Sequence, residues 1–288
     1  MGGNRYDASA RWNGRSGQAW VQLQSVMDHM YRPLESLLVD TVDPARRSVL
    51  DVGCGTGATT VAVARKLGPG ARVTGVDISD SMISAARARD AQLEFVRADV
   101  QDHEWAPASF DAVISRFGVM FFDDPVRAFA HLHRAATPEA GLVFLAWRDI
   151  AENPFMTVAE RAAAPLLPNL PPRRPDGPGQ FAFADPTRVH HFLDAAGWTG
   201  ITVEPTDVEC TLPEPELVGY FTRLGPVGLA LPDADDETRT EVITTVRAAF
   251  TPFIHGTEVR FPAACWLIRA QAAPRLKTPG ASAVTTNV

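Results

Sequence analysis

The sequence is poor in lysine and cysteine, and each scarcity narrows the functions open to the chain. Among 27 basic residues only Lys66 and Lys277 are lysine, so a mechanism that depends on a lysine has few candidates. Cys54, Cys210 and Cys265 lie far apart and are odd in number. This pattern indicates neither a disulfide framework nor a CxxC metal site. We therefore expect no metal, and a reducing, cytoplasmic location.

Long apolar runs and an excess of positive charge are also missing. No stretch of about 18 apolar residues occurs, so we expect no membrane span, and the polar N-terminus lacks the apolar core of a signal peptide. The net charge is −7 and the pI about 5.5. Since nucleic-acid binders usually carry a basic face, this balance argues against a nucleic acid as partner. A composition of 45% hydrophobic and 21% charged residues is typical of a globular protein.

The sequence pattern of residues 48–147 predicts strands that alternate with helices. Two helices are expected over 16–42, with an apolar stripe formed by Trp20, Leu23, Met27, Met30, Leu34, Leu37 and Leu38. A buried strand over 48–52 then runs into the glycine loop GCGTG at 53–57. The further expected strands are 72–76, 93–97, 110–115 and 142–147, and the expected helices are 58–67, 80–90 and 125–136. This alternation predicts right-handed βαβ units and a parallel sheet, and therefore an α/β fold.

The regular alternation ends near residue 150. We expect a helix near 154–164, a proline-rich connection, and a helix over about 186–196. The expected strand 201–209 contains Pro205, which suits the edge of a sheet. Residues 213–256 are expected to be largely helical, and 263–270 to form the last strand.

The glycine loop and two acidic residues indicate a nucleoside site. Asp77 ends the second strand, 20 residues after Gly57, and its carboxylate can accept both hydroxyl groups of a ribose. Glycines let the chain turn tightly and a ligand approach the backbone at the carboxyl ends of the strands. Asp99 ends the third strand, where it can receive an adenine amino group.

NAD is the alternative ligand, because Gly53, Gly55 and Ala58 also satisfy the dinucleotide-binding pattern. Against NAD, no tyrosine is followed four residues later by lysine, so a common catalytic pair of dehydrogenases is missing. A phosphate-binding P-loop is excluded, since no Gly-Lys-Ser/Thr occurs.

Four segments in order, VLDVGCGTG, VTGVDIS with Met82 three residues on, FVRADV and FDAVISRFGVMFF, resemble class I S-adenosylmethionine-dependent methyltransferases. The likeness is greatest to the group with the ubiquinone/menaquinone-biosynthesis enzymes and many natural-product methyltransferases. It implies a Rossmann-like, seven-stranded, mostly parallel sheet with helices on both faces and an antiparallel last strand, with 201–209 and 263–270 as the final hairpin. The implied division is an N-terminal helical lid (1–44), a cofactor-binding core (45–150), substrate-pocket insertions with the final strands (151–271) and a disordered tail (272–288).

The resemblance implies which residues hold the methionine portion of the cofactor. Gly53 and Gly55 back it, Asp51 reaches its ammonium group through water, and Ser115 and Arg116 lie beside it. A structural role in stiffening the turn is the alternative for Asp51.

The resemblance also implies how the nucleoside is bound. Asp77 holds the ribose hydroxyls, Ile78 and Met82 flank the adenine, and Asp99 and the Val100 amide contact the adenine edge. Met82 follows helical spacing, so a place in the core is equally open.

Trp20 and His29 belong to the expected N-terminal helices. Trp20 is a candidate to close over the cofactor, with an ordinary place in the apolar stripe as the alternative. His29 is the best single candidate for a general base, with a structural role as the alternative. His131 and His133 are two residues apart on a helix, so they face different sides and cannot share a metal.

The acceptor is expected to be a small hydrophobic or aromatic molecule, methylated on oxygen, nitrogen or carbon. The aromatic residues of the insertions indicate an apolar pocket; they are Phe155, Phe181, Phe183, Phe221 and Phe253. Other readings are an enzyme that uses S-adenosylmethionine for cyclisation or decarboxylation, a protein or RNA methyltransferase, and a binding module without activity. A homodimer remains open.

Overall fold

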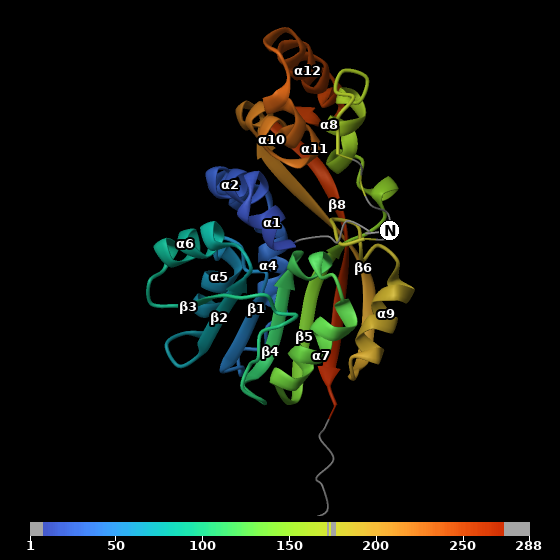
Figure 1. Ribbon diagram of the computed structural model, residues 1–288. Coiled ribbons are helices and arrows are strands. Elements are labelled where there is room, and N and C mark those ends of the chain that lie inside the picture. The colour runs from blue at the N-terminus through green and yellow to red at the C-terminus, as the bar shows by residue number, and fades with distance from the viewer. Residues whose placement is uncertain (1–7, 172, 174–176, 274–288) are drawn as a thin grey trace, which may run out of the picture.

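A single sheet organises the residues that the computed structural model describes, which are 8–171, 173 and 177–273. Its strands follow the order β3-β2-β1-β4-β5-β8-β6, and β7 pairs with the start of β8 (Figure 1). Strands β1, β2, β3, β4 and β5 run parallel to one another, whereas β8 runs antiparallel to both β5 and β6. The strands are β1 Ser48–Val52, β2 Arg72–Asp77, β3 Glu94–Arg97, β4 Phe110–Arg116, β5 Ala136–Trp147, β6 Trp198–Pro213, β7 Ile254–His255 and β8 Glu258–Ala272. The predicted Rossmann-like α/β fold is therefore confirmed.

The helices that follow the first strands have the local signals that the sequence indicates. Helix α5 (Ala58–Leu67) begins after Gly57 and ends at Gly68. Helix α6 (Asp80–Arg89) is capped by the Ser79 hydroxyl, and α7 (Pro125–Ala135) by the Asp124 carboxylate. Helix α9 (Pro186–Ala195) packs against α7, while α4 (Arg32–Asp40) packs against α5. The two pairs cover opposite faces of the sheet (Figure 1).

The N-terminal segment differs in detail from the expectation of two helices. It forms four short helices, α1 Ala8–Asn13, α2 Arg15–Gln22, α3 Gln24–Met30 and α4. The backbone leaves helical geometry at Gly14, Leu23 and Tyr31, which separate them. Of the predicted apolar stripe, Leu23, Met27, Met30, Leu34 and Leu38 are nonetheless buried and Leu37 is partly buried, because α3 and α4 pack against the sheet. Helix α2 contacts both α6 and α11 (Gly225–Ala230), so it lies between the sheet domain and a second group of helices.

That second group, which we call the helical lobe, surrounds the far ends of β6 and β8 (Figure 1). It comprises α8 Phe155–Ala163, α10 Leu217–Arg223, α11 and α12 Asp236–Ala249. Short 3₁₀ turns complete the chain: η1 Gly118–Phe121, η2 Ile150–Glu152, η3 Glu214–Glu216, η4 Leu231–Asp233 and η5 Thr251–Phe253. The final two strands are longer than predicted, with 16 residues in β6 and 15 in β8, because they carry the lobe beyond the rest of the sheet.

Strand β6 is an edge strand that pairs only with β8 along the sheet, as Pro205 indicates. The predicted disordered tail lies outside the described residues from position 274 onward, and Ala272 still belongs to β8. Among the described helices, none combines the length and apolarity needed to cross a membrane.

Candidate active site

A cavity of about 130 Å³ lies at the carboxyl ends of the parallel strands, around the glycine loop. We call it the glycine-loop cavity. Ten of the predicted site residues line it: Trp20, Asp51, Gly53, Gly55, Asp77, Ile78, Met82, Asp99, Val100 and Arg116. The first and last of these residues, Trp20 and Arg116, are 96 positions apart in the sequence. The fold therefore brings the predicted motifs together at one cavity.

Glycine is required at Gly53 because two loops meet there. Its φ is +66°, which L side chains rarely adopt, and a Cβ atom at this position would lie 2.6 Å from the Cα of Gly118. The turn is also tied to the next strand, because the amides of Gly53 and Cys54 both donate to the Val76 carbonyl, at 2.8 and 3.0 Å. The loop after β1 thus packs directly on the loop after β4.

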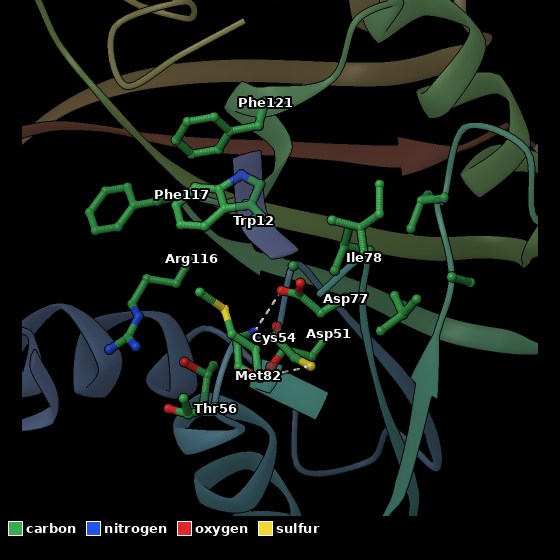
Figure 2. Close-up of a pocket in the computed structure, with 18 of the residues that line it drawn as sticks. Trp12, Asp51, Cys54, Thr56, Asp77, Ile78, Met82, Arg116, Phe117 and Phe121 are labelled. Carbon is green, nitrogen blue, oxygen red and sulfur yellow. Dashed lines mark hydrogen bonds between the residues drawn. The ribbon is translucent and has the colours of Figure 1, made fainter. Parts of the chain in front are cut away.

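Asp77 points into the glycine-loop cavity from the end of β2 (Figure 2). Its Oδ2 accepts a hydrogen bond from the Gly55 amide at 3.0 Å, and its Oδ1 accepts one from the Ser79 amide at 2.9 Å. Burial raises the pKa of this carboxyl group, while the amide hydrogen bonds act in the opposite direction. Each oxygen can accept a further hydrogen bond, so the carboxylate can hold two hydroxyl groups of a ligand.

Two opposite charges occupy the same cavity near the end of β4. Asp51 is 1% exposed, and its Oδ2 accepts a hydrogen bond from the Thr60 hydroxyl at 2.7 Å. Burial raises the pKa of Asp51 to about 6. The Arg116 side chain is 15% exposed, and its closest carboxylate, Glu35, is 3.9 Å away. Figure 2 shows Arg116 on one side of the cavity and Asp77 with Ile78 on the other. A zwitterionic amino-acid group matches this pair of charges.

The other end of the cavity is built from the residues after β3. Asp99 Oδ1 accepts a hydrogen bond from the Gln101 amide at 2.9 Å, and the Gln101 side chain in turn accepts one from the Asp124 amide at 2.8 Å. Met82 is buried and lines the cavity as well, so its two predicted roles do not exclude each other. Gln101 had no predicted role, because a lone glutamine after a strand carries no recognisable signal.

Two predicted site residues lie elsewhere. Ser115 lines neither cavity, because it is fully buried and its hydroxyl donates to the Val52 carbonyl of β1 at 2.7 Å. His29 also lines neither cavity, because its ring points toward β6, where Nε2 lies 3.5 Å from the Thr211 hydroxyl. The structure therefore gives Ser115 a role in holding two strands together and does not support His29 as a base.

A second cavity, of about 820 Å³, extends from the first toward the helical lobe. We call it the aromatic cavity. The two cavities share a wall of five aromatic residues, which are Trp12, Trp20, Tyr31, Phe117 and Phe121. Figure 2 shows the rings of Trp12, Phe117 and Phe121 gathered on the side of the glycine-loop cavity opposite Met82 and Thr56. Of this wall, only Trp20 was predicted.

The rings of the shared wall pack against neighbouring aromatic residues. Phe117 has a φ of +68°, a strained conformation for a side chain of this size, and its ring stacks on Trp147 at 4.6 Å. Trp12 packs edge-on against Phe121 at 5.0 Å, and its carbonyl accepts a hydrogen bond from the Ser79 hydroxyl at 2.7 Å. The wall therefore has fixed rings at the point where two ligands could meet.

The predicted aromatic residues of the insertions divide between this cavity and the core. Phe155, Phe181 and Phe221 line the aromatic cavity. Phe183 does not, because it is buried against Phe129 and Phe144, and Phe253 is also absent from the lining.

The acidic groups of the aromatic cavity are already engaged. Both carboxylate oxygens of Glu160 accept hydrogen bonds from Arg173 Nε, at 2.7 and 2.8 Å. Asp149 Oδ1 accepts one from the Ala151 amide at 2.8 Å. No histidine is found among the described residues that line either cavity. Nor does the described part of the chain bring three His, Cys, Asp or Glu side chains together as a metal site.

The comparison with known proteins agrees with this geometry. Residues 49–139 match the family described as a methyltransferase domain. The chain is 29% identical over 205 residues to nocamycin O-methyltransferase of Saccharothrix syringae, covering 66% of this chain and 73% of that protein. It is 28% identical over 176 residues to demethylmenaquinone methyltransferase of Renibacterium salmoninarum, covering 58% and 73%.

The fold also matches a solved structure, reported for the conversion of a disulfide bond into a thioacetal group during echinomycin biosynthesis. The TM-score is 0.55 and the identity 22%, over 85% of this chain and 83% of that one. The motifs, the sheet order and these relatives agree that residues 49–139 form a class I S-adenosylmethionine-dependent methyltransferase domain, similar to those of quinone-biosynthesis and natural-product enzymes.

Proposed function

We propose that this enzyme methylates an oxygen atom of a bulky, largely apolar acceptor whose hydroxyl group is acidic. The observation that carries the proposal is the aromatic cavity of about 820 Å³, which adjoins the glycine-loop cavity across a shared aromatic wall. Its volume lies within the range of sites for drug-sized ligands. The methyl acceptor would occupy the aromatic cavity, and the cofactor the glycine-loop cavity.

The charged residues of the glycine-loop cavity suit the amino-acid end of S-adenosylmethionine. Asp51 would attract the ammonium group and Arg116 the carboxylate, because these two side chains present opposite charges to the same cavity. Gly53 and Gly55 would let the ligand approach the backbone. The cofactor, when bound, supplies a methyl group on a positively charged sulfur, which is already electrophilic.

The rest of the glycine-loop cavity suits the nucleoside. Asp77 would accept hydrogen bonds from both ribose hydroxyls, and Ile78 and Met82 would flank the adenine ring. Asp99 and the Val100 amide would contact the edge of that ring.

The shared aromatic wall would have two roles. Its π faces favour a positively charged sulfonium, and its bulk excludes water from the point of transfer. Trp12 and Trp20 belong to α1 and α2, so residues 8–44 would act as a lid over the cofactor. Helix α2 contacts α6 and α11, which places it between the two halves of the site.

The absence of histidine from the described lining of both cavities favours an acidic oxygen as the nucleophile. An amine that is protonated at neutral pH must lose a proton before it can attack, and this step usually needs a base. Glu160 is paired with Arg173, Asp149 accepts the Ala151 amide, and the described residues that line the cavities include no histidine. An enol, a carboxylic acid or an acidic phenol ionises in water without help. The name of the nocamycin relative, an O-methyltransferase, is in agreement.

The test is to incubate the enzyme with S-adenosylmethionine and matched acceptors that differ only in the nucleophile. Polycyclic phenols, enols and carboxylic acids are compared with amines of the same skeleton, and products are identified by mass spectrometry. We expect S-adenosylhomocysteine to form together with a methyl ether or ester. Methyl transfer to the amines alone would overturn the proposed oxygen acceptor.

A further inference from the structure

Tyr31 is a largely buried residue whose hydroxyl group has no hydrogen-bond partner among the described residues. The residue is 5% exposed and lines both cavities. Its hydroxyl makes no hydrogen bond to any described residue. It is also not among the fully buried polar atoms that lack a partner, so part of its surface is accessible. Buried tyrosine hydroxyls generally find a hydrogen-bond partner. The missing partner is therefore expected to be a ligand at the junction of the cavities.

The ring of Tyr31 is held in place on several sides. It lies 6.4 Å from the stacked ring of Trp20, 5.8 Å from Phe117 and 6.1 Å from Trp147, measured between ring centroids. The Arg116 guanidinium lies 5.9 Å from the ring centroid, and its Nη1 donates to the Tyr31 carbonyl at 3.4 Å. These contacts set the position of the ring at the junction of the two cavities.

This hydroxyl can donate a proton in a hydrogen bond but cannot serve as a base. Burial raises the pKa of Tyr31 well above its ordinary value of 10, and the nearby Tyr220 acts in the same direction. Tyr31 is therefore uncharged near neutral pH. A neutral phenol forms its strongest hydrogen bonds as a donor to a negatively charged oxygen.

We propose that Tyr31 is a catalytic residue whose hydroxyl donates a hydrogen bond to the reacting oxygen of the acceptor and favours its ionised form. This inference rests on the oxygen acceptor proposed above. The acceptor first loses its proton to water. An electron pair of its oxygen then forms the bond to the methyl carbon as the carbon–sulfur bond breaks, and that bonding pair stays on sulfur. Tyr31 keeps its own proton throughout.

The test uses alizarin, a tricyclic phenol whose absorbance reports its ionisation, bound to the enzyme with S-adenosylhomocysteine. The variant Tyr31→Phe removes one oxygen atom and keeps the ring, so it leaves the aromatic packing in place. The apolar cavity acts on the probe equally in both proteins, so their difference isolates the hydroxyl. We expect the pKa of bound alizarin to be about one unit higher in the variant, a tenfold change in its ionisation constant.

The control is His29→Ala, because this side chain lines neither cavity and faces Thr211. It should leave the pKa of bound alizarin unchanged, and S-adenosylhomocysteine should bind all three proteins equally well. Equal alizarin pKa values in the wild type and Tyr31→Phe would overturn the role of Tyr31 and leave the acceptor class standing. If the wild type binds S-adenosylhomocysteine but not alizarin, the proposed acceptor class fails and this inference fails with it.

Discussion

Replacing Asp77 by alanine tests how the enzyme binds the ribose of its cofactor. In the structure each carboxylate oxygen accepts one backbone amide, from Ser79 at 2.9 Å and from Gly55 at 3.0 Å, and can accept one ligand hydroxyl in addition. Hydrogen bonds to a charged group are worth about 1.5–3 kcal/mol net. We expect the two ribose bonds together to fall in this range, because burial already disfavours the carboxylate, as its raised pKa shows.

The expected loss corresponds to a dissociation constant about 12- to 160-fold higher for S-adenosylhomocysteine. Isothermal titration calorimetry measures it directly. Asp80→Ala is the matched control, since this exposed acid three residues further on pairs with Arg97 and does not line the cavity. It should bind the ligand as the wild type does.

A second ligand pair separates ribose binding from support of the glycine loop. Asp77→Ala should weaken adenosine much more than 2′,3′-dideoxyadenosine, because only adenosine offers the two hydroxyls. Equal weakening of both ligands would mean that Asp77 acts through Gly55 and the loop. Affinity for S-adenosylhomocysteine within about twofold of the wild type would refute the reasoning altogether.

Three further predictions follow from the same geometry. Affinity for S-adenosylhomocysteine should fall as the pH drops through about 6, because protonation of Asp51 removes the charge that attracts the ligand's ammonium group. Calorimetry from about pH 5 to about pH 8 should show a shallower fall in affinity for Asp51→Asn than for the wild type. An identical fall in both proteins would contradict the assignment. Gly53→Ala should lower the free energy of unfolding by about 1–3 kcal/mol in urea titrations, because of its φ of +66° and the contact with Gly118, whereas Gly70→Ala, with nothing within 4 Å of the new Cβ, should not. His29→Ala should retain the full rate of methyl transfer at every pH, because the ring lies outside both cavities; a lower rate together with loss of the acidic limb of the pH–rate profile would restore it as a base.

Much of the core could be predicted because its signals are local. The glycine loop, the helix caps and the acids at or near the ends of the first three strands lie within successive βαβ units. In such units the right-handed connection dictates which strand ends meet. That is why Asp51, Asp77 and Asp99 line one cavity although they are far apart in sequence.

The side chains that complete the site depend on packing that no local pattern reports. Ser115 and Arg116 are neighbours at the end of β4, yet Ser115 turns inward to Val52. Whether a residue at the end of a strand faces a cavity or a neighbouring strand depends on that neighbour. The breaks between the N-terminal helices also set directions that a continuous periodicity would misplace, so His29 faces β6 while Tyr31 reaches the cavities.

The sequence by itself determined the parallel sheet, the cofactor loop and the family, because these depend on residues close together in the chain. Only the tertiary structure decided the aromatic wall and the second cavity. Trp12, Tyr31 and Phe117 belong to segments that meet only when the N-terminal helices pack over the loop after β4. Such long-range contacts depend on the shape of the whole core. They are driven by burial of apolar surface, which is non-directional, so no local sequence pattern specifies which side chains will meet.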